Sequence, residues 1–199
     1  MNSNLLLRQH WVFDLDGTLT QPIHDFPDIR RQLGVPEGIG ILEYIDQQPT
    51  PQKIILNRQL DKIETELAWQ ASANPGTVEL LFALQQRGCK LGILTRNQRN
   101  CVDIVLQRIG VAQLFENQAI IACEDAPPKP DPEGIRRIMD FWCVGPNECV
   151  MVGDYLYDLQ VGRAAGTATV HYAADRTERW PQLTDWVISE LLELQVTDT

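Results

Sequence analysis

The sequence has few of the features that mark secreted or membrane proteins. Its 199 residues include five cysteines, an odd number with no CxxC pair, which argues against a disulfide framework and favours a reducing compartment. No apolar run approaches the length of a membrane span, and the first ten residues hold too short an apolar stretch for a signal peptide. We therefore expect a cytoplasmic protein with no membrane partner.

Positive charge is also scarce. The chain carries 17 basic and 27 acidic residues, a formal net charge of −10. Non-specific nucleic-acid binding needs a concentrated basic surface, so we expect no nucleic-acid partner. An anionic substrate must be attracted by local cations, because the overall field opposes it. Acyl transfer also fits badly, because none of the three histidines lies in a plausible place beside a serine or cysteine nucleophile.

From about Pro75 onward, helix-like and strand-like stretches alternate. Short apolar strands are predicted at 90–95, 119–123, 149–153 and 168–172, with helices at 79–88, 100–110, 132–142 and 158–166. This alternation is typical of an α/β protein whose parallel sheet is covered by helices on both faces. Leu183, Val187, Leu191 and Leu194 recur at helical spacing, so we also expect a C-terminal helix.

Residues 21–74 interrupt this alternation. They contain no convincing strand and are punctuated by prolines. Their longest predicted element is a helix at 52–70, with Leu56 and Leu60 on its apolar face. We interpret 21–74 as a small α-helical cap domain inserted after the first strand, and 1–20 together with 75–199 as the core domain. The alternative, that this segment is one more layer of the core, stays open.

Two aspartates one residue apart, Asp14 and Asp16, end the first apolar run in the stretch WVFDLDGTLT. Side chains alternate along a strand, so both carboxylates project to one side if the extended backbone persists. They then repel each other unless one is protonated or a cation lies between them. The simpler alternative is a strand that runs into an Asp-Gly turn.

Polar side chains come after the other strands too. Thr95, Arg96 and Asn97 follow the second strand, Lys129 lies in the loop after the third, and Asp154 and Asp158 follow the fourth. In an open parallel sheet, ligands bind beyond the carboxyl ends of the strands, so we expect these groups to converge on one rim.

The chemistry of these groups is coherent. The carboxylates are hard oxygen ligands of the kind Mg²⁺ prefers: Asp14, Asp16, Asp154 and, as a further candidate, Asp158. The hydroxyl of Thr95 and the ammonium of Lys129 suit phosphoryl oxygens. The set predicts phosphoryl transfer, in which catalysis is mainly positioning and charge neutralisation.

The same residues carry a resemblance to a known family. DLDGT at 14–18, the Thr of ILTRN, the Lys of PKPDP and GDYLYD at 153–158 resemble, in order and in placement after strands, the four motifs of the haloacid-dehalogenase (HAD) superfamily. The resemblance covers roughly residues 8–20 and 75–175. The insert lies where members with a type C1 helical cap, similar to phosphoglycolate phosphatase and β-phosphoglucomutase, place theirs. It implies a Rossmann-like parallel sheet core with a helical cap.

The resemblance also implies a role for each motif residue. Asp14 matches the nucleophile that becomes an aspartyl-phosphate, and Asp16 matches the general acid/base. Thr95 and Lys129 match the phosphate-binding pair, and Lys129 would also hold Asp14 ionised. For Mg²⁺, the resemblance implies three ligands and one auxiliary acid: Asp14, the backbone carbonyl of Asp16, Asp154 and, as the auxiliary acid, Asp158.

Arg96 departs from the family pattern. Capped phosphatases often have asparagine directly after the motif threonine, whereas here Arg96 follows Thr95 and Asn97 comes next. Arg96 either joins the phosphate-binding residues and clamps a second anionic group of the substrate, or lies in solvent or in a structural ion pair.

Asp16 also bears on the type of reaction, because dehalogenase-like members lack the acid/base at this position and P-type ATPases have threonine there. The resemblance therefore implies a Mg²⁺-dependent phosphatase that hydrolyses a small phosphorylated metabolite. The alternatives are a phosphomutase of the β-phosphoglucomutase type and a non-catalytic binding protein on the same fold. We expect a monomer or homodimer, and we assign no role to His24.

Overall fold

A single parallel sheet forms the centre of the protein. The computed structural model describes residues 3–23, 25–174 and 177–195, so His24 lies outside the described residues. Six strands pair in the order β3-β2-β1-β4-β5-β6, and every pair is parallel. Their bounds are β1 (His10–Phe13), β2 (Lys90–Leu94), β3 (Ile120–Ile121), β4 (Cys149–Gly153), β5 (Ala168–Tyr172) and β6 (Trp186–Ile188). The predicted α/β, Rossmann-like fold is confirmed.

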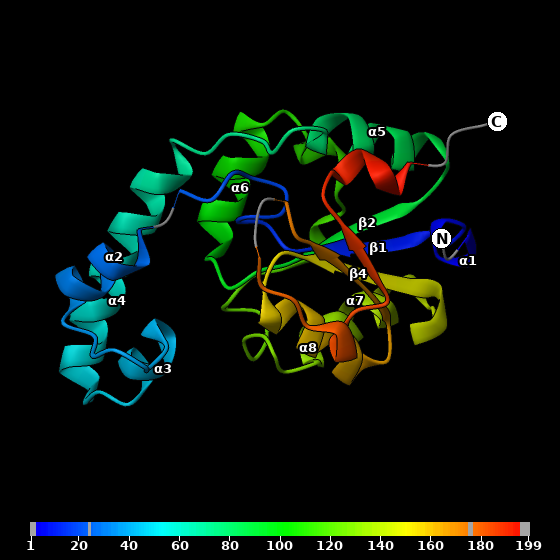
Figure 1. Cartoon of the computed structure of the whole chain (residues 1–199). Helices are drawn as coiled ribbons and strands as arrows, with labels where there is room; N and C mark the ends of the chain where they lie inside the picture. The colour runs from blue at the N-terminus through cyan, green and yellow to red at the C-terminus, as the bar shows by residue number, and fades with distance from the viewer. Residues whose placement is uncertain (1–2, 24, 175–176, 196–199) are drawn as a thin grey trace.

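Helices cover both faces of the sheet (Figure 1). A short helix, α1 (Ser3–Leu6), precedes β1. Helices α5 (Thr77–Gln86) and α6 (Arg99–Arg108) pack on one face, while α7 (Glu133–Trp142) and α8 (Leu156–Ala165) pack on the other. Strand β1 serves both hydrophobic cores, because Trp11 and Phe13 join the first cluster and Val12 joins the second. Burial on both faces explains why the strands are continuous apolar runs without alternation.

Three helices lie to one side of the sheet, on the left in Figure 1. They are α2 (Phe26–Leu33), α3 (Ile41–Asp46) and α4 (Thr50–Ala68), and no strand occurs among the described residues of the 21–74 segment. They enclose a hydrophobic cluster of their own, formed by Ile29, Leu33, Val35, Ile45, Leu56 and Leu60. The apolar face predicted for the long helix therefore packs within this group of helices.

The chain leaves the sheet region after Thr20 and returns at Asn74, and hydrogen bonds hold the two crossings together. The Nδ2 amide of Asn74 donates to the carbonyl oxygens of Gly17, Thr18 and Thr20, at 3.2, 2.8 and 2.9 Å. Asn74 is buried, so these bonds form where water does not compete for them. The turn after β1 is thus fixed from the far end of the helical segment.

The predicted C-terminal helix is wrong. Residues 181–183 and 191–194 form short 3₁₀ turns, and between them β6 pairs in parallel with β5 at the edge of the sheet. Leu191 and Leu194 are buried in the main core, as the pattern required, but Val187 is 42% exposed. Apolar spacing of three and four residues suits a turn-strand-turn path as well as a helix. Pairing with the free edge of β5 favours the turn-strand-turn path.

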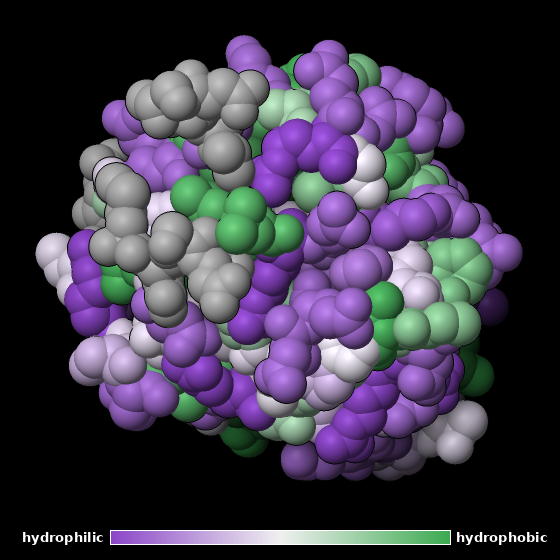
Figure 2. All heavy atoms as spheres, turned by 90° about the vertical axis from the view of Figure 1, so that its right-hand side faces the viewer, coloured by the Kyte–Doolittle hydropathy of each residue, from purple (hydrophilic) through white to green (hydrophobic). Residues whose placement is uncertain are grey.

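The face of the molecule away from α2, α3 and α4 is mainly hydrophilic, with separate apolar patches (Figure 2). No helix in the described part of the chain is both long enough and apolar enough to cross a membrane. All five cysteines fall in the described ranges and all are free thiols.

Candidate active site

Three neighbouring strands end at the same place. Phe13, the last residue of β1, pairs with Ile93 of β2 and with Val152 of β4. Asp14 therefore emerges between these strands, and its amide donates to the Val152 carbonyl at 2.9 Å. Strand β1 is also where the chain order of the sheet reverses, since β2 lies on one side and β4 on the other. Such a switch point is where open parallel sheets bind ligands.

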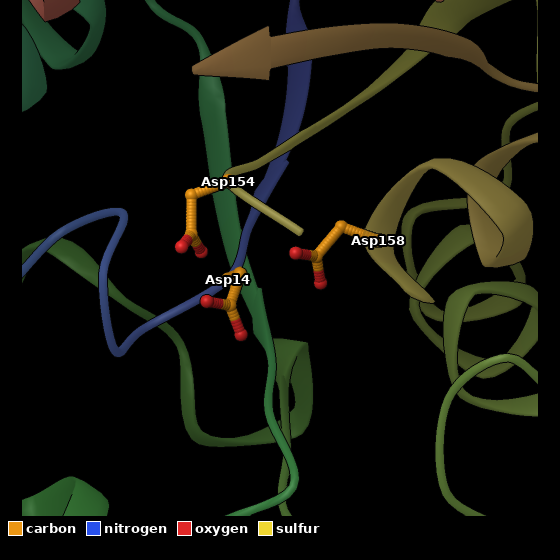
Figure 3. Close-up of side chains that lie close together, drawn as sticks. All are labelled: Asp14, Asp154 and Asp158. Atoms are coloured by element: carbon orange, nitrogen blue, oxygen red, sulfur yellow. The ribbon is translucent and has the colours of Figure 1, made fainter. Parts of the chain in front are cut away.

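Three buried carboxylates gather at this point (Figure 3). Oxygen atoms of Asp14, Asp154 and Asp158 lie within 4.8 Å of one another. Asp14 and Asp154 follow β1 and β4, while Asp158 lies in the first turn of α8. The ammonium of Lys129 donates to Asp14 Oδ1 and, at 2.6 Å, to Asp158 Oδ1. Lys129 is only 4% exposed, so both ion pairs are shielded from solvent.

The burial of this cluster controls its ionisation. Desolvation raises the pKa of Asp14 well above its ordinary value, Lys129 opposes that rise, and Asp158 and Asp154 add to it. Burial alone lowers the pKa of Lys129, but its two carboxylate partners outweigh burial and raise that pKa above the usual range. The ammonium therefore stays charged, while a further positive charge nearby would favour the ionised form of Asp14.

The segment after Asp14 packs directly against Asp154. Gly17 has a φ of +86°, and a Cβ atom at this position would lie 2.5 Å from Asp154 Oδ2. Thr18 donates from Oγ1 to Asp154 Oδ1 at 3.1 Å. The Gly-Thr of the DLDGT motif is thus required by the close approach of its backbone to the carboxylate cluster.

The cluster has the chemistry of a divalent-cation site. Its donors are all carboxylate oxygens, and its three carboxylates face one ammonium, which leaves an excess of buried negative charge. Mg²⁺ is held by few carboxylates together with water and substrate phosphate. The residues present therefore fit Mg²⁺.

Asp16 has different surroundings from Asp14. Its half-buried carboxylate accepts hydrogen bonds from Thr20 Oγ1, at 3.2 Å, and from the Asn97 side-chain amide. The side chain is therefore held by the turn after β1 and by the loop after β2, beside the carboxylate cluster and not within it.

A cavity of about 560 Å³ opens above these groups. Its floor includes the predicted residues of the strand ends, and its opposite wall comes from the helices of the 21–74 segment. The residues predicted from the motifs that line it are Asp14, Asp16, Thr95, Arg96, Lys129, Asp154 and Asp158. The structure thus brings every candidate site residue to one cavity.

A model of the haloacid dehalogenase-like hydrolase family matches residues 10–166 of the chain. The chain belongs to this family. It is 33% identical over 162 residues to an uncharacterized hydrolase of Saccharomyces cerevisiae, covering 80% of this chain and 74% of the relative. It is 38% identical over 181 residues to the pyrophosphatase PpaX of Bacillus pumilus, covering 81% and 82%.

The fold of this HAD-like hydrolase also matches solved structures. A hydrolase from Pseudomonas syringae superposes with a TM-score of 0.76 at 23% identity, covering 94% of this chain and 96% of that one. The predicted family is therefore confirmed by sequence, and the fold by structure.

Arg96, where this HAD-like hydrolase departs from the motif pattern, forms an ion pair. Its guanidinium lies 2.6 Å from Glu43 Oε1 on α3, and its Cζ lies 5.1 Å from the centre of the Tyr157 ring. Thr95 beside it is buried, and its Oγ1 accepts a hydrogen bond from the Asn97 backbone amide at 3.1 Å. Arg96 thus joins the loop after β2 to the helices across the cavity.

Nothing in the sequence singles out Glu43 or Glu64 in this HAD-like hydrolase. Glu43 pairs with Arg96, and Glu64 of α4 lines the cavity with a buried Oε2 that has no hydrogen-bond partner among the described residues. Neither belongs to a motif, and both lie on helices that turn toward the cavity only in the folded chain. Asn97 follows Thr95 by two residues, but its hydrogen bond to Asp16 cannot be predicted from the sequence.

Proposed function

We propose that this HAD-like hydrolase is a Mg²⁺-dependent phosphatase that hydrolyses a small phosphorylated metabolite through an aspartyl-phosphate. The observation that carries the proposal is the buried ammonium of Lys129 between Asp14 and Asp158, beside Asp154, on the floor of a cavity. A buried carboxylate with a fixed cation beside it suits attack on a phosphoryl group. The pyrophosphatase among the relatives supports phosphoryl transfer as the reaction class.

In the first half of the reaction, a carboxylate oxygen of Asp14 attacks phosphorus and the bond to the leaving oxygen breaks. Asp16 gives its proton to that oxygen, so the product leaves as a neutral alcohol. Thr95 and Lys129 bind the phosphoryl oxygens during the transfer. Thr20 and Asn97, which hold the Asp16 carboxyl, fix the direction from which the proton comes.

In the second half, Asp16 takes a proton from water, and the oxygen of that water attacks the phosphorus of the aspartyl-phosphate. The bond between phosphorus and Asp14 breaks, inorganic phosphate leaves, and both aspartates return to their starting states. Asp16 thus acts first as acid and then as base, which its position at the edge of the cavity allows.

Mg²⁺ would be held by Asp14, by Asp154 and by the backbone carbonyl of Asp16, with Asp158 as an auxiliary acid that also holds Lys129. When bound, it supplies positive charge that offsets the crowded carboxylates and the substrate phosphate. We further propose that 21–74 is a cap domain over a core formed by 1–20 and 75–199, and that closure over the cavity excludes water.

The test is hydrolysis of 4-nitrophenyl phosphate by wild type and by Asp14→Asn, each with Mg²⁺ and with EDTA. Asparagine keeps the shape of the side chain but removes the nucleophilic charge, so we expect a loss of at least about a thousandfold in turnover. EDTA should stop the wild-type reaction. Asp140→Asn, an exposed carboxylate of α7 outside the cavity, is the matched control and should retain full activity.

Activity that survives Asp14→Asn would overturn the mechanism. A phosphomutase would instead transfer the phosphoryl group to a second alcohol, so release of inorganic phosphate in step with nitrophenol separates the two reactions. A binding protein would release neither product.

A further inference from the structure

The wall of the cavity opposite the carboxylate floor is mostly apolar. On the side of the 21–74 segment it is formed by Phe26, Ile29, Ile41, Leu42 and Leu60. An alcohol whose surface is partly apolar gains free energy by contact with such a wall, whereas a charged group would lose hydration there without compensation.

Two tyrosines of the GDYLYD stretch line the same cavity from the core side. The rings of Tyr155 and Tyr157 meet edge to face with centres 5.3 Å apart, and Trp180 meets Tyr155 edge to face at 5.9 Å. Tyr155 is 49% exposed, so its ring presents a free surface at the rim. Aromatic surfaces of this kind bind rings and apolar faces of a ligand.

Every described cation that lines the cavity already has partners. Lys129 is held by Asp14 and Asp158 on the floor. Arg96 is paired with Glu43 and lies over Tyr157. Arg30 donates from Nη1 to two backbone carbonyls of the loop after α2, at 3.0 and 2.6 Å.

A second anion on the substrate finds no unpaired cation among the described residues that line the cavity. Glu64 and Asp16 both line the cavity, and Glu64 has the buried oxygen without a partner among the described residues. A second negative group on a substrate would have to displace Glu43 to reach Arg96. A hydroxyl can donate to the buried Oε2 of Glu64, whereas an added carboxylate would lose hydration against the apolar wall.

We infer that the cavity selects phosphate monoesters of uncharged alcohols with an apolar face and rejects substrates whose leaving group carries a second negative charge. Glu43 is the determinant, because it pairs with Arg96, the cation of the loop after β2 that lines the cavity. This inference rests on the proposed phosphatase activity and adds to it the class of leaving group. It separates this chain from its pyrophosphatase relative, whose named substrate has phosphate as the leaving group.

The experiment compares two aryl esters that differ by one carboxylate, phenyl phosphate and 4-carboxyphenyl phosphate, with Mg²⁺ present. For wild type we expect kcat/KM to favour phenyl phosphate by about tenfold or more, since the added carboxylate meets an apolar wall and the described cations of the cavity are already paired. Inorganic pyrophosphate should be hydrolysed more slowly than phenyl phosphate. A wild-type preference for the carboxylate or for pyrophosphate would overturn the inference, and this readout requires no variant.

Glu43→Gln then tests the determinant. The substitution frees the guanidinium of Arg96, so the ratio of the two kcat/KM values should fall by about tenfold, through faster turnover of 4-carboxyphenyl phosphate. Glu66→Gln is the matched control, because Glu66 lies on α4 with a side chain 65% exposed, pairs with Lys62 and does not line the cavity. It should leave the ratio unchanged.

The outcomes separate this inference from the proposed function. If wild type hydrolyses both esters equally, the selectivity is refuted while the phosphatase stands. If Glu43→Gln keeps the wild-type ratio, Glu43 is refuted as the determinant. If wild type hydrolyses neither ester nor 4-nitrophenyl phosphate, the phosphatase itself is refuted, and the inference with it.

Discussion

The floor and the opposite wall of the cavity are built by different rules. The floor lies at the ends of β1, β2 and β4, where hydrogen-bonded strands fix the position of each charged side chain. The wall comes from α2, α3 and α4, whose hydrophobic cluster is separate from those of the sheet. The floor therefore holds the charged groups in fixed positions for chemistry, and the wall offers apolar surface that can vary without disturbing them.

The two sides also differ in how their charges are paired. On the floor, Lys129 is enclosed between Asp14 and Asp158, all at 9% side-chain exposure or less. Across the cavity, Arg96 and Glu43 are 22% and 44% exposed. Buried pairs are costly to break on one side, whereas partly exposed pairs are weak and exchangeable. This contrast predicts which substitutions destroy the protein's function and which redirect it.

The largest effect should come from Lys129→Met. The substitution leaves three buried carboxylates without their ammonium, so we expect the free energy of unfolding to fall by about 3–5 kcal/mol and turnover to be lost. The matched control is Lys90→Met, which removes the same group from a pair with Glu116 in which both side chains are about half exposed. That variant should change stability by about 1 kcal/mol or less in urea unfolding. Equal losses in the two variants would contradict the contrast between buried and exposed pairs.

Gly17→Ala should come next, with an effect on activity and little on the fold as a whole. Gly17 and Gly34 both have a positive φ, so alanine costs about 1–2 kcal/mol of stability at either position. Only at position 17 does the new Cβ meet Asp154, whereas nothing lies within 4 Å at position 34.

Displacing Asp154 should lower turnover by about a hundredfold, and Gly34→Ala should leave turnover unchanged. Parallel assays of the two variants with 4-nitrophenyl phosphate check this expectation. A similar loss of turnover in both would show that backbone strain, and not the contact with Asp154, is responsible.

Glu64→Gln should change stability in a way that depends on pH. Burial raises the pKa of Glu64 from 4.5 to about 8, with Asp16, Asp61 and Glu124 adding to the rise. Between these two values the folded state holds a proton that the unfolded state releases, so this group lowers stability as the pH increases.

Glutamine has no proton to lose, so the variant should be more stable than wild type at pH 8 and differ little from it at pH 4.5. Urea unfolding at the two pH values measures the difference, with Glu66→Gln as the exposed control. A gain of equal size at both pH values would show that ionisation of the Glu64 carboxyl does not lower the stability of the folded protein.

Several features of the fold can be predicted from the sequence because they depend on residues that are close together along the chain. Apolar runs bounded by glycine and polar turns indicated the strands and the helices of the core, and the spacing of Leu56 and Leu60 indicated the long helix α4. The C-terminal region was predicted wrongly, because Leu191 and Leu194 are buried in either conformation and the free edge of β5 decided the matter. Pairing with a distant strand is a tertiary contact that a local pattern does not contain.

The sequence by itself determined the floor of the cavity. Asp14, Thr95 and Asp154 each come directly after an apolar strand, and parallel strands all end at one edge of the sheet, so the meeting of these residues was implied by their order alone. Only the tertiary structure decided the wall. Arg96 meets Glu43 across 53 residues of sequence, and Glu64 turns toward the cavity from a helix with no motif. Helix orientation is set by packing of apolar faces, which fixes no particular polar partner in advance.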